Sequence, residues 1–149
     1  MLNLVVAMRG SSVSQRDHDN EFQDNTERQY SYDFDHIIRA HLLRRLSPAM
    51  NREGSALELG AYKGDMTAQL LDYFPELDVI EASGVLADEV RRRFSTRVRV
   101  TTGLFEEVEP DKAYDNIFLV HTLEHLDEPV QTLARIGKWL SATGSLFVV

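Results

Sequence analysis

The sequence contains no cysteine, which excludes disulfides, cysteine-ligated zinc and thiol nucleophiles. This absence is typical of a reducing compartment and predicts a cytoplasmic protein. The sequence also lacks an apolar run long enough to span a membrane, so we expect no membrane partner. Basic residues are few, and the net charge of −8 argues against a nucleic-acid surface. No spacing of histidine, aspartate and glutamate recurs as a ligand set, and we therefore predict no metal site.

The length of 149 residues predicts a single domain. Residues 10–29 are polar and rich in Ser, Asp, Asn and Gln. We therefore assign residues 1–29 to a flexible N-terminal arm and residues 30–149 to the folded domain. Residues 1–8 are apolar but lack the basic start and the cleavage site of a signal peptide. They are either an extra strand or a misassigned start, with Met8 as the initiator.

Short apolar runs alternate with helical patterns along the predicted domain. The runs predict strands at residues 56–59, 77–81, 98–101, 116–120 and 145–149. Helical spacing predicts helices near residues 34–46, 66–74, 86–94 and 130–140. This alternation predicts an α/β fold in which helices cover both faces of a parallel sheet. Ligands of such sheets bind beyond the carboxyl ends of the strands, where the strand order reverses.

Two of the predicted helices carry apolar rows. In the first helix the row consists of Phe34, Ile37, Ile38, Leu42 and Leu46. Asp33 is the expected N-cap of this helix, and Pro48 is its stop. We interpret the aromatic residues Tyr30, Tyr32 and Phe34 as a staple that holds the helix on the domain, and the alternative is a lid over a ligand pocket. In the last helix, one face is marked by Val130, Leu133, Gly137 and Leu140.

Residues 56–65 carry the strongest local signal, because an apolar strand ends in a glycine-containing turn that opens a helix. Gly60 permits the backbone angles that such a turn requires, and Gly64 lets a helix or a ligand approach closely. We interpret this as a nucleotide-type binding turn, and the alternative is a tight turn without a ligand. A dinucleotide site would need glycine where Tyr62 stands, so the turn favours a ligand that has no pyrophosphate.

The pattern Glu58-x-Gly60-x-x-x-Gly64 resembles the first motif of class I S-adenosylmethionine-dependent methyltransferases. Residues 114–129, which include Leu123-Glu124-His125-Leu126, look like the fourth-strand motif of that family, and residues 144–149 match its fifth strand. The resemblance covers residues 55–149 in register and is nearest in pattern to bacterial small-molecule, polysaccharide and quinone methyltransferases. It implies a Rossmann-like sheet, S-adenosylmethionine as cofactor, and a small molecule or a saccharide as methyl acceptor.

The resemblance also implies a cofactor pocket at the carboxyl ends of the predicted strands. The implied lining residues are Glu58, Gly60, Ala61, Tyr62, Gly64, Glu81, Ala82, Leu104, Phe105 and His121. Glu81 ends the second strand about twenty residues past the turn, where one carboxylate can accept both hydroxyls of a ribose; the alternative is a solvated strand-end acid. Glu58 can accept N–H groups of the turn or hold the amino-acid part of the ligand, or it is a surface charge.

Two features depart from the family pattern. Leu104 stands where the family often places an acid for the adenine, so backbone groups and the faces of Leu104 and Phe105 would hold that base. Alternatively, both residues are plain core. The chain also stops at Val149, before the helix and two strands with which family domains continue. The last strand would then be an open edge, and we expect either a homodimer through residues 145–149 or a fragment of a longer protein.

A hydroxyl acceptor would require a general base, and His125 and His121 follow the fourth predicted strand. His125 is the preferred candidate, although both histidines could be structural. We therefore predict S-adenosylmethionine-dependent methyl transfer. The first alternative is a nucleoside-binding module that lacks the acceptor site. The second is an NAD-dependent oxidoreductase, which the glycine pattern disfavours.

Overall fold

A five-stranded parallel sheet forms the centre of the computed structural model, which describes residues 33–105 and 107–149. Its strands lie in the order β3-β2-β1-β4-β5. They are Ala56–Leu59 (β1), Leu77–Glu81 (β2), Val98–Thr102 (β3), Tyr114–Leu119 (β4) and Leu140–Val148 (β5). The predicted α/β fold class is confirmed, and the first four predicted strands match the observed ones to within two residues. The predicted arm, with Tyr30 and Tyr32, lies outside the described residues.

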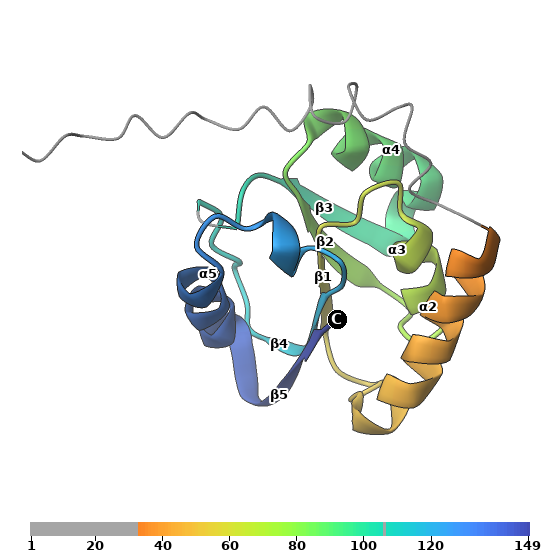
Figure 1. Ribbon diagram of the computed structural model, residues 1–149, viewed down its shortest axis with the longest axis horizontal. Coiled ribbons are helices and arrows are strands. Elements are labelled where there is room, and N and C mark those ends of the chain that lie inside the picture. The colour runs from red at the N-terminus through yellow and green to blue at the C-terminus, as the bar shows by residue number, and fades with distance from the viewer. Residues whose placement is uncertain (1–32, 106) are drawn as a thin grey trace, which may run out of the picture.

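The helices lie on two sides of this sheet (Figure 1). One face is covered by Asp33–Leu46 (α2), Asp65–Leu70 (α3) and Gly84–Phe94 (α4), and the other by Pro129–Ile136 (α5). The crossovers through α3 and α4 step the chain from β1 to the β3 edge, and the chain then returns past β1 to β4. Among the described residues, no helix has the length and the apolar character needed to cross a bilayer.

Alternating side chains along the strands build two apolar layers. On β4, Phe118 points toward α2, α3 and α4, while its neighbour Ile117 points toward α5. The ring of Phe118 is fully buried and lies between two other aromatic rings. It stacks on Phe147 of β5 at a centroid distance of 4.9 Å and meets Phe74 edge-on at 5.8 Å. These rings attach the edge strand β5 to the helical layer.

Helix α2 turns most of its predicted apolar row away from the sheet. Three residues of that row are each more than half exposed, namely Phe34, Ile37 and Ile38. Leu43, which is outside the row, is fully buried instead. Polar contacts with α3 account for this rotation: Gln69 Nε2 lies 2.8 Å from Nδ1 of His36 and 3.1 Å from its carbonyl oxygen. The helix ends at Leu46, just before the predicted stop.

Helix α5 also differs from its sequence pattern. It buries Thr132 and Ile136, whereas Val130 is 79% exposed. Leu140 is not helical, because the chain passes through the 3-10 turn Gly137–Trp139 directly into β5. The buried indole of that turn draws the chain back to the sheet one turn earlier than the apolar spacing indicated.

Helix α3 is shorter than predicted and ends at Leu70 rather than at Phe74. The residues that follow form a turn, and backbone carbonyls of this turn accept hydrogen bonds from outside the helix. The guanidinium of Arg97 donates to the carbonyls of Leu71 and Phe74 at 2.7 and 3.4 Å. A side chain distant in sequence therefore satisfies carbonyls that have no partner within the helix, and Pro75 has no N–H to offer to the carbonyl of Leu71.

Candidate functional site

The strand order reverses between β1 and β4, the two parallel neighbours at the centre of the sheet. Leu59 at the end of β1 pairs with Leu119 at the end of β4, so the segments that follow them emerge at the same edge. Open α/β sheets bind ligands at such a reversal. The structure therefore brings the glycine turn after β1 and the two histidines after β4 to one edge of the sheet.

The turn after β1 contains three residues with positive φ, which is 78° at Gly60, 51° at Tyr62 and 84° at Gly64. Gly64 is the left-handed residue from which α3 starts, and a β-carbon there would lie 2.6 Å from the ring of Phe94 on α4. At Gly60 the equivalent atom would lie 2.8 Å from the hydroxyl oxygen of Thr122. Only glycine fits both positions, and the turn is held closely against α4 and the segment after β4.

Glu81 at the end of β2 connects three of the carboxyl-end segments. One carboxylate oxygen accepts the backbone N–H of Tyr62 at 2.9 Å, and the other accepts that of Ser83 at 3.0 Å. The carbonyl of Glu81 accepts the N–H of Gly103, after β3, at 3.0 Å. Glu81 is only 6% exposed, so a solvated strand-end acid does not describe it.

Glu58 is the next-to-last residue of β1 and is 2% exposed. Its Oε2 atom accepts the hydroxyl of Thr67 on α3 at 2.6 Å. Burial raises the pKa of the Glu58 carboxyl to about 8, and this rise is opposed by the Thr67 hydrogen bond and increased by the charge of Glu81. Glu58 is therefore a buried acid beneath the turn and not a surface charge.

The remaining residues implied for the pocket differ in burial. Phe105 is 6% exposed and packs in the apolar layer beneath α5. Of the two alternatives that the sequence allowed for this residue, its position matches a core residue. Leu104 is half-buried. Ala61 in the turn is buried in the layer beneath α2, α3 and α4, and Ala82 is half-buried beside Glu81. Of the two residues after β3, Leu104 is therefore the one that a ligand can reach.

Both candidate catalytic histidines are exposed. His121 has a φ of 52°, and its N–H donates to the carbonyl of Val149 at 2.8 Å. Backbone held in such a sparsely populated region is frequent at functional sites. His125 lies in the 3-10 turn Leu123–His125. Within the described ranges, no group of three or more histidine, aspartate or glutamate side chains could hold a metal ion.

Three hydroxyl residues of the site were missed by the sequence analysis. Thr67 binds the acid of β1, and Thr122 Oγ1 lies 3.1 Å from the carbonyl oxygen of Leu59. Ser83 caps α4 by accepting an N–H of its first turn at 3.3 Å. A serine before a helical pattern is an N-cap signal, so Ser83 could have been found. The two threonines bear no local signal, because their partners lie elsewhere in the chain.

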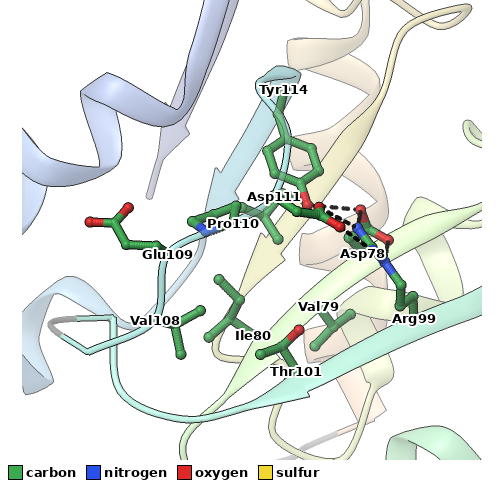
Figure 2. A pocket seen from close by; sticks show the side chains of 11 residues that line it. Asp78, Val79, Ile80, Arg99, Thr101, Val108, Glu109, Pro110, Asp111 and Tyr114 are labelled. Carbon is green, nitrogen blue, oxygen red and sulfur yellow. Dashed lines mark hydrogen bonds and ion pairs between the residues drawn. The ribbon is translucent and has the colours of Figure 1, made fainter.

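A cavity of about 190 Å³ lies elsewhere on the sheet, beneath the segment that connects β3 to β4 (Figure 2). Apolar and polar side chains both line it, among them Val79, Ile80, Val108, Asp78, Arg99 and Tyr114. None of the residues that the sequence placed in the cofactor pocket contributes to its wall. This cavity is therefore distinct from the edge at which the glycine turn lies.

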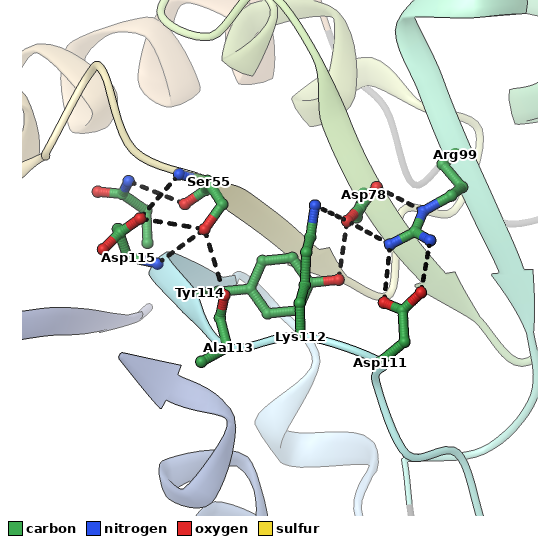
Figure 3. Close-up of polar contacts among 9 residues, drawn as sticks. Ser55, Asp78, Arg99, Asp111, Lys112, Ala113, Tyr114 and Asp115 are labelled. Carbon is green, nitrogen blue, oxygen red and sulfur yellow. Dashed lines mark hydrogen bonds and ion pairs between the residues drawn. The ribbon is translucent and has the colours of Figure 1, made fainter. Parts of the chain in front are cut away.

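The charged residues beside this cavity neutralise one another (Figure 3). Arg99 donates to Asp78 at 2.9 and 3.0 Å and to Asp111 at 3.0 and 3.2 Å. Lys112 and the hydroxyl of Tyr114 each contact Asp78 at 2.8 Å. Burial opposes ionisation of Asp78, but these hydrogen bonds outweigh it and lower its pKa to about 2. The network ties β2, β3 and the start of β4 together and has a structural role.

Comparisons with known proteins agree with this architecture. A family model described as a methyltransferase domain matches residues 15–149. Coclaurine N-methyltransferase bound to N-methylheliamine and SAH has a TM-score of 0.67 and 23% identity, and the match covers 81% of this chain and 37% of that chain. CalS10, an amino pentose methyltransferase from Micromonospora echinaspora, has a TM-score of 0.67 and 17% identity. That match covers 94% of this chain and 58% of CalS10.

A third solved structure, the glycopeptide N-methyltransferase MtfA complexed with S-adenosylhomocysteine, has a TM-score of 0.65 and 21% identity. That match covers 74% of this chain and 51% of MtfA. At these identities the likenesses establish the fold. The chain spans about half the length of these structures, from 37% to 58%. No curated protein matches the sequence.

Proposed function

This chain belongs to the methyltransferase-domain family, and we propose that it binds S-adenosylmethionine at the carboxyl edge of its sheet and passes the methyl group to a small-molecule or saccharide acceptor. The cofactor supplies a methyl group that is already activated on a sulfonium. Transfer of that group is an in-line displacement, so correct positioning of donor and acceptor can supply much of the catalysis. The task of the chain is therefore to hold both molecules in line.

The observation that carries this proposal is the contact between the acid of β2 and the turn of β1. Because the N–H of Tyr62 donates to Glu81 at 2.9 Å, the two elements that would bind one nucleoside already meet in one place. The N–H groups of Tyr62 and Ser83 donate to the two carboxylate oxygens of Glu81 and hold the carboxylate at the end of β2. A carboxylate held at this strand end, beside the glycine turn, is placed to accept hydroxyl groups of a ribose.

The proposed cofactor residues come from four strand ends. They are Glu58, Gly60, Ala61, Tyr62, Gly64, Glu81, Ala82, Leu104 and His121, with Phe105 supporting Leu104 from the core. Glu81 orients the ribose, and the turn at positions 60–64 lies against the amino-acid part. Leu104 covers one side of the adenine. These roles rest on placement at the strand ends and on the chemistry of the side chains.

His125 is the proposed general base for a hydroxyl acceptor, with His121 as the second candidate. Both rings are exposed at the edge that carries the glycine turn. Histidine accepts protons near neutral pH. A base is needed less when the acceptor is an uncharged amine. We therefore expect His125→Ala to lower the rate of hydroxyl methylation by about 100-fold or more, with a much smaller effect on amine methylation.

The names of the structural neighbours, which state their substrates or bound ligands, support the proposed class of acceptor. Two are N-methyltransferases, one bound to N-methylheliamine and one acting on a glycopeptide, and the third is an amino pentose methyltransferase. Small amines and amino sugars are accordingly the first acceptors to test. Incorporation of a labelled methyl group into a panel of amines, amino sugars and hydroxyl compounds identifies the acceptor atom.

Titration calorimetry with S-adenosylmethionine, S-adenosylhomocysteine and NAD tests the cofactor assignment. We expect both adenosyl ligands to bind and NAD not to bind. Glu81→Ala should weaken binding at least tenfold, which corresponds to about 1.4 kcal/mol. Glu76→Ala, at an exposed acid just before β2, is the matched control and should leave the affinity unchanged. Equal affinity in the two variants would remove the ribose role from Glu81.

A nucleoside-binding module is the second candidate function. The contacts of Glu81 with the turn after β1 support this candidate equally, because they concern the nucleoside and not the acceptor. In this case the adenosyl ligands bind with the same dependence on Glu81, but no acceptor in the panel gains a methyl group. Calorimetry and methyl incorporation therefore separate the two candidates from each other.

Two further proposals concern assembly and location. Strand β5 is the edge of the sheet, and its outer backbone groups offer a pairing surface to a second copy. We propose a homodimer through residues 145–149, which size-exclusion chromatography with light scattering would detect as twice the chain mass. We also propose a cytoplasmic location, which rests on the absence of cysteine from the sequence. Cell fractionation tests it.

A further inference from the structure

Glu58 is an acid buried without a cationic partner. It is 2% exposed, and among the described residues no lysine, arginine or histidine forms an ion pair with it. The Thr67 hydroxyl donates to its Oε2 atom at 2.6 Å, and this is the one hydrogen bond that the described part of the chain gives to the carboxyl group. An isolated carboxylate in such surroundings is costly, and a carboxyl group in this position normally retains its proton.

The groups that surround Glu58 do not supply a compensating charge. On β2, Glu81 is a second acid that disfavours ionisation of Glu58. On α2, the charge of Arg39 favours ionisation from a distance, but that guanidinium lies 4.0 Å from Asp65 of α3 and is shared with it. On β4, the neighbour in register is the apolar Phe118. Burial and like charge therefore outweigh the single distant cation, and the pKa of about 8 has the same direction.

We propose that Glu58 carries a proton in the ligand-free protein and releases it to solvent when a cationic nucleoside ligand enters the site, so that the site distinguishes the positively charged methyl donor from its uncharged product. This inference rests on the proposed function, because it places that ligand over the turn after β1. Glu58 is then a specificity-determining residue of the same site.

The charges of the two ligands explain the discrimination. S-adenosylmethionine carries a sulfonium, an ammonium and a carboxylate, with a net charge of about +1 near neutral pH, whereas S-adenosylhomocysteine has lost the sulfonium charge and is neutral overall. A bound cation favours the ionised form of Glu58 and lowers its pKa. Once the methyl group has left, the ionised carboxylate lacks its counter-charge. Glu58 then takes a proton back from solvent, and the product is held less tightly than the donor.

Proton release on binding is the direct test. The binding enthalpy of each ligand is measured at pH 7.0 in two buffers whose ionisation enthalpies differ, which gives the number of protons released. We expect close to one proton for S-adenosylmethionine and a clearly smaller number for S-adenosylhomocysteine. Between pH 6.0 and 7.5 the affinity for the donor should rise about 20-fold, because protonated Glu58 competes with the cation. The affinity for the product should change less than about twofold.

Glu58→Gln removes the proton and keeps the shape of the side chain. In this variant we expect no proton release with either ligand and a donor-to-product affinity ratio that does not change with pH. Glu53→Gln, at an exposed acid before β1, makes the same charge change and should behave as the wild type. Thr67→Val provides a second readout, because loss of its hydrogen bond raises the pKa of Glu58 further and moves the pH dependence upward.

The outcomes separate this inference from the function on which it rests. Proton release that persists unchanged in Glu58→Gln, or that is equal for donor and product, overturns the inference while the ligands still bind. If Glu58→Gln does not fold, an unshifted pH profile in Thr67→Val has the same consequence. If neither adenosyl ligand binds the wild-type protein, the proposed function fails and this inference fails with it.

Discussion

A β-carbon added to Gly64 would lie 2.6 Å from a ring carbon of Phe94, because the turn after β1 packs directly against the end of α4. Gly64 also has a φ of 84°, a conformation that side chains of L-residues rarely adopt. Two independent constraints therefore act on one residue, and both originate in the geometry of the candidate site. A glycine at this position holds the turn close to the helix that begins beside Glu81.

Gly64→Ala should destabilise the protein by about 2–4 kcal/mol, as the sum of backbone strain and overpacking against Phe94. Urea unfolding measures this loss. Gly137→Ala is the matched control, since Gly137 has an ordinary helical backbone and no atom within 4 Å of an added β-carbon. That control should be neutral or slightly stabilising. A Gly64→Ala loss of less than 0.5 kcal/mol would show that α4 moves aside freely.

The rotation of α2 can be tested by two substitutions on its opposite faces. Leu43 is fully buried, so Leu43→Ala should cost about 2–5 kcal/mol through loss of apolar burial and an unfilled cavity. Ile37 is 68% exposed, so Ile37→Gln should change the free energy of unfolding by no more than about 0.5 kcal/mol. If Ile37→Gln proves to be the more damaging of the two, the apolar row predicted from the sequence faces inward after all.

The ion pair between Asp78 and Arg99 should make stability fall in acid. The pKa of Asp78 is about 2 in the folded protein and near 3.9 in an unfolded chain. Because the pKa is lower in the folded protein, ionised Asp78 stabilises the fold above the unfolded-state pKa of about 3.9. This contribution to the free energy of unfolding is lost as the pH falls toward 2. We expect roughly 2 kcal/mol of stability to disappear over this range, and thermal unfolding between pH 6 and pH 2 measures it.

Asp78→Asn should be less stable than the wild type near neutral pH and should lose less stability on acidification. Asp88→Asn is the control, because Asp88 pairs with Arg91 at an exposed position on α4 and its side chain is 78% exposed. The pH profile of this control should follow that of the wild type. Parallel profiles for all three proteins would show that the network beside the cavity does not hold the fold together in acid.

The stacked rings of Phe118 and Phe147 should control the opening of the edge strand. Phe147→Ala removes the ring that attaches β5 to the core, so amide exchange in residues 145–148 should accelerate more than exchange in β1. Val148→Ala, at a position that is 42% exposed, should leave exchange in β5 nearly unchanged. Hydrogen exchange followed by mass spectrometry measures both. Uniform acceleration across the whole sheet would indicate global destabilisation instead.

Features that depend on a local signal could be predicted from the sequence. The glycine turn was predicted because its positive φ values depend on the residue types at positions 60 and 64. The position of Glu81 followed from its spacing, since one strand, one turn and one helix set the distance to the next strand end. The buried face of α2 could not be predicted, because the partners of His36 and Leu43 come from other elements.

By itself, the sequence determined the order of strands and helices, the turn after β1 and the acid at the end of β2, because each depends on contacts and periodicities within a few residues. Only the tertiary structure decided that Glu58 is buried with a raised pKa, that Thr67, Ser83 and Thr122 hold the site, and that Asp78 is ionised between Arg99 and Lys112. These properties arise when parallel crossovers bring distant segments together, and burial and charge then depend on neighbours that no local pattern specifies.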